Sequence, residues 1–519
     1  MDKGLFALGL VAATVSVGAS FACRLLFGTP YLPELAASAV FSLVPGSLES
    51  AAVENLGPLA KETTYLVASV VLVLVLALVP PLLRRVGVLP RGAASTLLAS
   101  AASTYAVLVT LAALFLSLTQ VSTLPVSPAS AALGMLIPGL VFAAAFGALS
   151  TNPTGPGRRA YPTERAKGRY DRKRRLFIAS VAGTAVGAAI LYYGVGLLFS
   201  KQTAVQAGQE TDQILSAKVT PNSDFYRVDI NILAPTVNSA SWTLKLHGLV
   251  NTPLTFDYST IQSLAAVEEY ATLECVSNNV SGDLMGTALW KGVKLKTLLE
   301  MAGVNSQAEY LVFKCYDGYD VGIPLERAMA DGTLLAYEMN GEPLPTDHGY
   351  PLRAIVPGLY GMMNAKWVTD IELVSGSYDG FWQRRGWTNV ATYQTGSTIL
   401  TPGDAPLRDR FPIPSGLTDI SGSPIPIIGA AFSGDRGISR VEVSTDGGNT
   451  WQAASLYDPL SEYTWVFWRL DWSPPAAGAY KLMVRATDGS GQVQVATMTN
   501  PYPSGATGYS VVDVRVAST

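Results

Sequence analysis

The sequence predicts a multi-domain fold of three parts: an all-α N-terminal half with five transmembrane helices, a middle region that mixes strands with short helices, and a C-terminal all-β sandwich. Charged residues make up only 14% of the 519 residues, where soluble globular proteins have about 25%, and the mean hydropathy is +0.28. Residues 1–201 hold 16 Lys and Arg against 7 Asp and Glu, whereas residues 202–519 hold 20 against 32. Patterns typical of β-strands dominate the second part.

Five uncharged stretches in the first part are long enough to cross about 30 Å of hydrocarbon, which takes roughly 20 residues. They are residues 4–23, 63–83, two stretches within 92–157 that are broken near 123–128, and 176–200. The apolar segment 31–44 is shorter and carries Glu34, so we expect it to be interfacial or re-entrant. No Asp, Glu, Lys or His lies inside the five stretches, which favours an anchor over a transport role.

Basic residues in short loops predict the orientation of these spans. Arg84, Arg85 and Arg91 follow the second span, and residues 158–175 carry nine Lys and Arg against two acids before the fifth. We therefore expect the N-terminus in the cytoplasm and everything after residue 201 outside a bacterial cytoplasmic membrane. The stretch 174–178 (RRLFI) resembles a twin-arginine export signal, and the alternative is a basic stop before a helix.

The composition excludes several classes of function. Three cysteines are too few for a zinc ribbon or an iron–sulfur cluster of the chain's own. The two histidines, His247 and His348, both lie in the second part, so no haem can be held between the predicted spans. An acidic second part has no electrostatic footprint for nucleic acid.

We divide the second part into a linker (202–222), a mixed domain (223–400), a linker rich in Pro, Gly and Ser (401–426) and a β-sandwich domain (427–519). Strands are predicted at 241–249 and 309–314 and a helix at 294–301 in the mixed domain. Short strands at 427–432, 439–444, 463–471, 479–486 and 510–516, separated by turn residues, are typical of a sandwich. Cys275 and Cys315 could form a disulfide, or one could be a metal thiolate; their spacing does not decide.

Three ordered blocks of the second part resemble the sulfite oxidase-type molybdenum enzymes. Residues 272–278 (TLECVSN) resemble the family's T-L-x-C-x-x-N segment. Residues 335–367 contain LAYEMNGEPL, DHGYPLR, VPG and KW in the family's order, and residues 440–451 (RVEVSTDGGNTW) resemble its Ig-like dimerisation module. The resemblance runs from about residue 223 to residue 519. It implies an α+β molybdopterin domain followed by an Ig-like domain, and a possible homodimer.

The resemblance also implies residue roles. Cys275 would be the thiolate ligand of molybdenum, a pairing that suits a soft sulfur donor. His348, Arg353 and Lys366 would hold the anionic pterin and its phosphate. Further cofactor-binding positions would be Tyr226, Asn278, Asp317, Asn364 and Ala365. Cys315 would be a buried small hydrophobe with no bridge to Cys275.

The substrate residues depart from the family pattern. Arg227 stands where one pocket arginine is expected, but residues 279–281 and 501–505 lack two others, and Trp387 occupies the position of a tyrosine. We take Arg227 and Trp387 as the catalytic candidates beside Cys275. A pocket with fewer positive charges should attract a small dianion such as sulfite less strongly.

We therefore expect a membrane-anchored, extracytoplasmic, molybdenum-dependent oxidoreductase that performs two-electron oxygen-atom transfer, with sulfite oxidation as one candidate reaction. The alternatives are reduction of a sulfoxide, such as methionine sulfoxide, on the same cofactor, and a non-catalytic membrane-anchored binding protein. With no haem and no iron–sulfur cluster, electrons would pass to an external partner, either a cytochrome c-like protein or a membrane electron carrier. An acidic second part would suit a basic redox partner.

Overall fold

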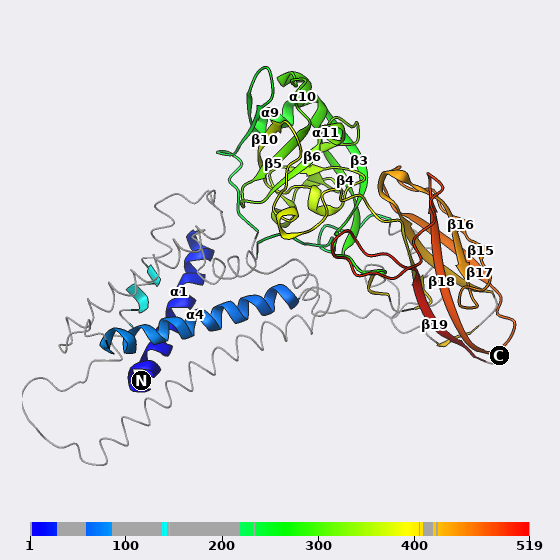
Figure 1. The fold of residues 1–519 in the computed structure, drawn as a ribbon, viewed down its shortest axis with the longest axis horizontal. Helices are drawn as coiled ribbons and strands as arrows, with labels where there is room; N and C mark the ends of the chain where they lie inside the picture. Colours follow the sequence, from blue (N-terminus) through cyan, green and yellow to red (C-terminus); the bar gives the residue numbers. More distant parts are fainter. Residues whose placement is uncertain are drawn as a thin grey trace, which may run out of the picture. The chain divides into compact units, whose positions relative to one another are not determined.

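The computed structural model describes residues 3–27, 59–85, 137–138, 140–142, 145, 218–231, 234–403, 405–407, 419–421 and 424–517. The chain forms two compact units, shown in Figure 1. One lies within the first 204 residues, and the other contains Val205–Thr519 together with two short earlier segments. Each unit is described by itself.

Two long helices dominate the described part of the N-terminal unit (Figure 1), α1 (Lys3–Phe27) and α4 (Leu59–Arg85). Their small apolar cluster contains Ala12, Leu76 and Phe142. The Ser16 hydroxyl donates to the carbonyl of Pro138 at 2.8 Å. Gly9 of α1 lies against α4, where a Cβ would come 2.7 Å from the Ala77 carbonyl oxygen, so the two helices approach closely.

The predicted half of five transmembrane helices is wrong. In the residues that the structure describes, no helix combines the length and the apolar character needed to cross a membrane. The prediction rested on stretches without charge, and lack of charge is not equivalent to hydrophobicity. A span also requires one continuous helix that is long and apolar over its whole length, and an uncharged stretch of sequence does not by itself specify one. The spans predicted at 92–157 and 176–200 and the twin-arginine segment fall outside the described residues, apart from a few positions between 137 and 145.

The first sheet of the second unit has the strand order β2-β1-β10-β5-β6. Its strands are β1 (Thr243–Gly248), β2 (Leu254–Asp257), β5 (Tyr310–Cys315), β6 (Asp320–Pro324) and β10 (Val368–Val374). β1 and β10 run parallel, and the other neighbours are antiparallel. The short helices are α9 (Tyr258–Ser263), α10 (Leu295–Ala302) and α11 (Leu325–Ala328).

The second sheet carries the strand that leads into Cys275. Its order is β3-β4-β7-β8, and β9 pairs with β7. The strands are β3 (Ala266–Glu274), β4 (Met285–Lys294), β7 (Leu334–Met339), β8 (Glu342–Pro343) and β9 (Arg353–Ile355). Single 3₁₀ turns follow at η1 (Thr346–His348), η2 (Gly361–Met363) and η3 (Gln383–Arg385). β3 pairs only with β4 within this sheet, so it is an edge strand.

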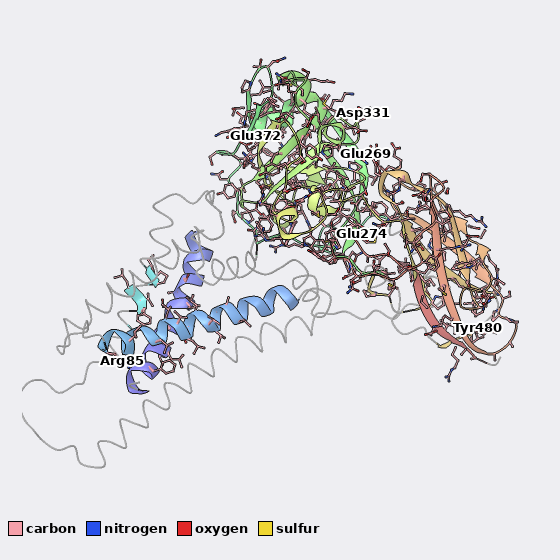
Figure 2. The ribbon with its side chains drawn as sticks, viewed as in Figure 1. Arg85, Glu269, Glu274, Asp331, Glu372 and Tyr480 are labelled. Atoms are coloured by element: carbon pink, nitrogen blue, oxygen red, sulfur yellow. The ribbon has the colours of Figure 1, made fainter. Side chains whose placement is uncertain are left out.

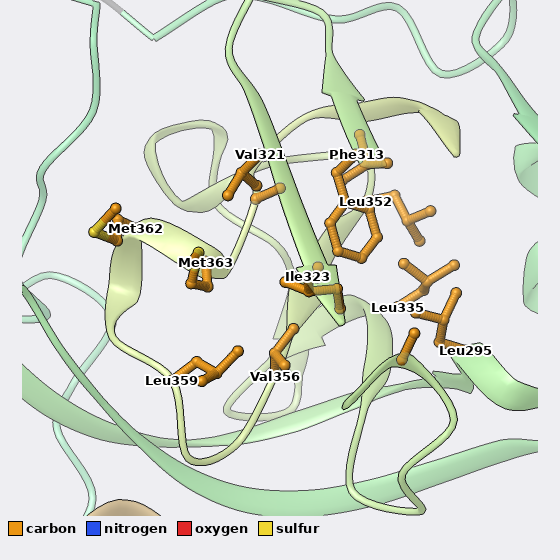
Figure 3. Packing of buried hydrophobic residues seen from close by; sticks show 14 of the residues in the cluster. Leu295, Phe313, Val321, Ile323, Leu335, Leu352, Val356, Leu359, Met362 and Met363 are labelled. Carbon is orange, nitrogen blue, oxygen red and sulfur yellow. The ribbon is translucent and has the colours of Figure 1, made fainter. Parts of the chain in front are cut away.

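One apolar core supports the loops between these strands. Figure 3 shows Phe313, Val321 and Ile323 from β5 and β6 packing with Leu352 and Val356 beside β9. All five side chains are fully buried. The same cluster includes Met362 and Met363, so the loop between β9 and β10 is built directly on the core.

The C-terminal strands form two sheets around a separate core, which confirms the predicted strands at 427–432 and 510–516. The orders are β11-β13-β17-β16 and β12-β19-β18-β14-β15. The strands are β11 (Gly396–Thr401), β12 (Asp419–Ile420), β13 (Ile425–Phe432), β14 (Ile438–Ser444), β15 (Gln452–Ala453), β16 (Ser455–Leu456), β17 (Val466–Trp472), β18 (Gly478–Asp488) and β19 (Ser510–Val516). Trp468 and Val484 lie in this core. We call residues 393–517 of this unit the C-terminal domain below.

Candidate cofactor site

Cys275 lies immediately after β3, on a turn that its neighbours hold in place. Its amide donates to the Leu284 carbonyl at 2.9 Å, and its Sγ lies 3.0 Å from the Ser277 hydroxyl. Glu274, labelled in Figure 2, is the last residue of β3. Asn278 closes the turn, because its amide donates to Glu274 Oε1 at 2.9 Å and its Oδ1 accepts from the Leu284 amide at 3.0 Å. The thiol is free, and its burial raises its pKa.

Arg353 and Lys366 are brought together by two short chain segments. The Ala354 amide donates to the Ala365 carbonyl at 2.8 Å. Gly349 lies against both cations: a Cβ there would sit 3.0 Å from the Cβ of Arg353 and 3.2 Å from that of Lys366. Its φ of +114° also favours glycine. A larger residue at this position would separate the two cations.

The guanidinium of Arg353 is buried, with only 4% of the residue exposed. It donates to the carbonyls of His348 at 3.1 Å and Asn364 at 3.5 Å, and it lies 4.7 Å from the ring centre of Trp290. Its Nε has no hydrogen-bond partner, and no carboxylate of the described segments forms an ion pair with it. Burial lowers its pKa to about 10.

Lys366 and Arg227 share one carboxylate, which the sequence analysis did not identify. Asp229 Oδ2 accepts from Lys366 Nζ and from Arg227 Nε, both at 2.9 Å, and the Asp229 side chain is only 3% exposed. Arg227 also pairs with Asp347 at 3.2 Å. The sequence could have indicated the Arg227–Asp229 pair by its spacing, since residues two apart in an extended segment lie on the same face.

Tyr226 and Asp317 join the same group of side chains. The phenol of Tyr226 is buried, which raises its pKa well above the usual value, and it lies within electrostatic range of Cys275 and Arg353. Asp317 accepts from the Tyr319 amide at 3.1 Å and the Asn231 side chain at 2.6 Å. Burial raises the pKa of Asp317 to about 6, with Asp229 and Lys366 as charged neighbours.

His348 and the two predicted asparagines are tied to the backbone. His348 Nε2 lies 3.1 Å from the Asn222 carbonyl, and burial followed by the nearby Arg353 charge lowers its pKa to about 4. Asn364 Oδ1 accepts from the Val356 amide at 2.7 Å, and its Nδ2 donates to two carbonyls at 3.1 Å. The side chains of Asn364 and Asn278 therefore shape the loops, and Ala365 contributes its carbonyl to the same framework.

Trp387 lies apart from the other predicted site residues. It is 6% exposed, its ring centre lies 5.2 Å from that of Tyr502, and its Nε1 has no hydrogen-bond partner. Within the described segments, no contact of Trp387 with Cys275 or Arg353 is recorded. Cys315, at the end of β5, is a buried free thiol, and burial raises its pKa well above the usual value.

The donor set fits an anionic group that brings its own metal ligands. Among the residues that the structure describes, no three His, Cys, Asp or Glu side chains are grouped as a metal cage. Cys275 is therefore a single soft ligand, and a metal bound there would need further ligands from a cofactor. The unpartnered Nε of Arg353 and its buried, unneutralised charge fit an anion such as a phosphate.

Comparisons with known proteins agree with this donor set. A family profile described as the oxidoreductase molybdopterin binding domain matches residues 231–382, and the Mo-co oxidoreductase dimerisation domain matches residues 412–502. Mitochondrial sulfite oxidase of Macaca fascicularis is 31% identical over 322 residues, covering 54% of this chain and 58% of its own length. The uncharacterized oxidoreductase YuiH of Bacillus subtilis is 34% identical over 146 residues, covering 28% of this chain and 72% of its own.

The chain spans about 58 to 62% of the length of the mammalian sulfite oxidases that it matches. The crystal structure of the sulfane dehydrogenase SoxCD from Paracoccus pantotrophus overlaps 58% of this chain and 84% of its own chain, with 24% identity and a TM-score of 0.49.

His348 should make the fold less stable in mild acid. Its pKa is about 4 in the folded chain and 6.5 when exposed, so the unfolded chain binds the proton more readily between these values. Stability is complete above pH 6.5 and should fall by on the order of 3 kcal/mol as the pH drops to 4. Urea unfolding at several pH values between 4 and 6.5 measures the free energy of unfolding. His348→Gln removes the titrating group, so its free energy of unfolding should not fall with pH in this way. An equal slope in the variant would contradict the assignment.

Proposed function

Since the chain belongs to the family of oxidoreductases with a molybdopterin-binding domain, we propose that it performs two-electron oxygen-atom transfer at a molybdenum–pterin cofactor. Cys275 is the protein's ligand to the metal in this proposal. The observation that carries it is the common neighbourhood of a buried free thiol and two buried cations: Cys275 lies within electrostatic range of Lys366, and Tyr226 lies within range of both Cys275 and the carboxylate-free guanidinium of Arg353. A purely structural cysteine would not require a buried cation nearby.

The bound cofactor supplies the redox chemistry, and the chain supplies binding and orientation. Arg353 and Lys366 hold the anionic part of the cofactor, Arg353 as a planar fork and Lys366 as a point charge. His348 stays neutral at physiological pH, because its pKa is about 4. Its Nε2 donates to the Asn222 carbonyl, so its Nδ1 is left as an acceptor. The turn closed by Asn278 keeps the thiol of Cys275 at the end of β3.

Sulfite oxidation and sulfoxide reduction remain the two candidate reactions. The sulfite oxidase relatives support the first. The second is supported by charge pairing: Arg227 is committed to Asp229 and Asp347, and Arg384 to Asp320 at 2.7 Å. Cations engaged in this way hold a small dianion less strongly. The catalytic roles of Arg227 and Trp387 stay predictions.

Metal analysis with Cys275→Ser tests the cofactor proposal. We expect about one molybdenum and one pterin per chain in the unchanged protein, made by a host that assembles the cofactor. Cys275→Ser should lose turnover with sulfite and with methionine sulfoxide, because the thiolate ligand is gone. Cys315→Ser is the matched control, since it removes the other buried thiol, and it should keep both metal and turnover.

Absence of molybdenum from the unchanged protein would contradict the proposal. It would favour the non-catalytic binding protein, for which Cys275→Ser would also leave ligand binding unchanged.

The electron partner is proposed to be an external basic protein of the cytochrome c type. Residues 202–519 carry a formal charge of −12, which attracts a basic partner. The range of this attraction is the Debye length, which falls from about 30 Å at an ionic strength of 0.01 M to about 8 Å at 0.15 M. Turnover with such an acceptor should fall roughly tenfold over this range. Turnover with an uncharged small-molecule acceptor is the control and should stay constant. Equal behaviour of the two acceptors would contradict the electrostatic docking.

The location outside a bacterial cytoplasmic membrane also stays a proposal, supported by the basic first part and the acidic second part. An alkaline phosphatase reporter joined after residue 519 should be active, because that enzyme requires export. Activity of a reporter that works only in the cytoplasm would contradict the proposal.

The match to a dimerisation domain supports a homodimer, which sedimentation equilibrium of the purified chain would test.

A further inference from the structure

The strand that ends at Cys275 has an open edge that the C-terminal domain covers. β3 is the terminal strand of its sheet. The Ser461 hydroxyl donates to the Tyr270 carbonyl at 2.5 Å, and the Thr272 amide donates to the Tyr463 carbonyl at 3.0 Å. The two contacts occupy backbone groups of β3 that lie two residues apart. The segment 461–465 is not itself a strand, so it covers the edge without extending the sheet.

Thr272 is the centre of this junction. It is 3% exposed, and its Oγ1 accepts from the Trp465 amide at 3.0 Å. The same oxygen lies 2.5 Å from the hydroxyl of Thr287, its register partner on β4. One buried hydroxyl therefore joins β3 to β4 on one side and to the C-terminal domain on the other, three residues before Cys275.

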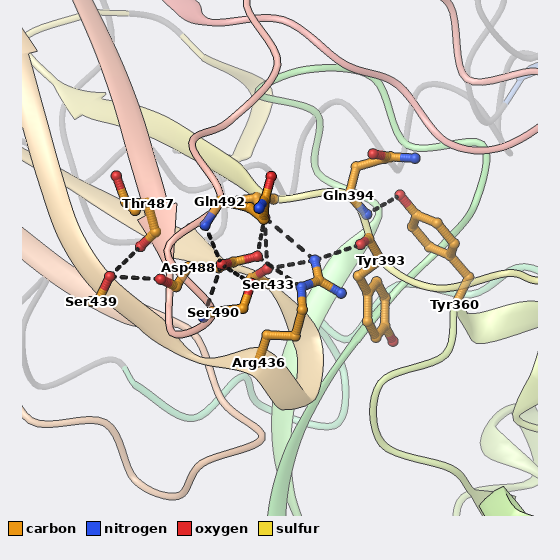
Figure 4. A network of polar contacts seen from close by, with 11 residues as sticks. Tyr360, Tyr393, Gln394, Ser433, Arg436, Ser439, Thr487, Asp488, Ser490 and Gln492 are labelled. Atoms are coloured by element: carbon orange, nitrogen blue, oxygen red, sulfur yellow. Dashed lines mark hydrogen bonds and ion pairs between the residues drawn. The ribbon is translucent and has the colours of Figure 1, made fainter.

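A second arm of the C-terminal domain reaches the end of β3. The turn η5 (Gly434–Arg436) carries Arg436, whose guanidinium pairs with Asp488 at 2.9 Å and donates to the Tyr393 carbonyl at 2.8 Å. Figure 4 shows this network. The Tyr393 hydroxyl accepts from the Glu274 amide at 3.4 Å, the residue before Cys275.

Tyr393 also touches the loop that carries the cations. Its ring centre lies 4.7 Å from that of Tyr360, and the Tyr360 hydroxyl accepts from the Gln394 amide at 3.1 Å. The backbone carbonyl of Tyr360 in turn accepts from the side chain of Asn364 at 3.1 Å. Asn364 lies two residues before Lys366. The same arm therefore contacts the thiol strand and the cation loop.

We infer that the C-terminal domain completes the cofactor site by closing the open edge of β3, with Thr272 as the positioning residue for the Cys275 thiol. The inference rests on the proposed function of Cys275 as a metal ligand. It assigns the C-terminal domain a role within one chain, beyond any role in joining two chains. An unpaired edge strand opens readily, and a thiol at its end would then sample several positions.

The first test measures the exposure of the thiol in the full chain made without cofactor. Thr272→Val keeps the shape of the side chain but leaves the buried Trp465 amide without an acceptor, so alkylation of Cys275 by iodoacetamide should become about tenfold faster. Thr272→Ser keeps the hydroxyl and should restore the unchanged rate. Peptide mass spectrometry separates Cys275 from Cys315, whose rate should stay constant. Equal Cys275 rates in all three proteins would overturn the inference.

The second arm gives an independent variant should Thr272→Val fail to fold. Arg436→Met removes the contact with Tyr393, and we expect faster alkylation of Cys275. Arg485→Met is the matched control, because Arg485 has a similar exposure and pairs with Glu442 at 3.0 Å within the sandwich. Equal rates in the Arg436 and Arg485 variants would overturn the inference.

The third readout uses the loaded protein. Thr272→Val should retain molybdenum but change the electron paramagnetic resonance signal of the metal, which a merely structural role would leave unaltered. Retained metal with an unaltered signal would overturn the inference. Lack of molybdenum in the unchanged protein would instead overturn the proposed function, and the alkylation rates of the cofactor-free chain would still decide the inference.

Discussion

The buried charge of Arg353 is the constraint on which the site depends. Removing an unpaired guanidinium from water costs several kcal/mol, and among the residues that the structure describes two carbonyls and the face of Trp290 offset that cost. The loop between β9 and β10 must therefore present those carbonyls accurately. Asn364 holds the loop through three backbone contacts, and Gly349 leaves room for Lys366 beside Arg353. A site built at this cost is explained by an anionic group that balances the charge when bound.

The site combines two chemically unlike halves on separate chain segments. The thiol of Cys275 lies at the end of an edge strand, and the positively charged side chains of Arg353 and Lys366 lie on a loop that packs on the main core. Asp229 moderates the cations, because its buried carboxylate pairs with both Arg227 and Lys366 and partly neutralises their charge. The two halves meet at the tyrosines, since Tyr226 lies near both Cys275 and Arg353, and Tyr393 contacts both supporting segments.

The C-terminal domain has a larger part in this architecture than its separate core implies. Its residues 461–465 bond to β3, and Arg327 of α11 forms an ion pair with Asp435 of η5. Apolar side chains of the C-terminal domain, among them Phe432, Trp465 and Phe467, also join the main core. The polar contacts therefore add register to an attachment that is largely apolar. The N-terminal part shows how a pattern can mislead: stretches without charge predicted spans, whereas no described helix combines the length and the apolar character that crossing a bilayer requires.

The sequence by itself determined the chemistry, because identities alone place a cysteine in a TLECVSN segment and His, Arg and Lys in ordered blocks downstream. It also predicted the C-terminal strands, since alternation and turn residues are local signals. Only the tertiary structure decided which side chains are available. Asp229 became visible through its burial between two cations. Asn364 is bonded to backbone groups, and Asn278 to the Glu274 carboxylate and the Leu284 amide. Thr272 matters because β3 is an edge strand. Hydrogen-bond satisfaction and sheet position depend on residues up to about two hundred positions apart, and no local pattern records such contacts.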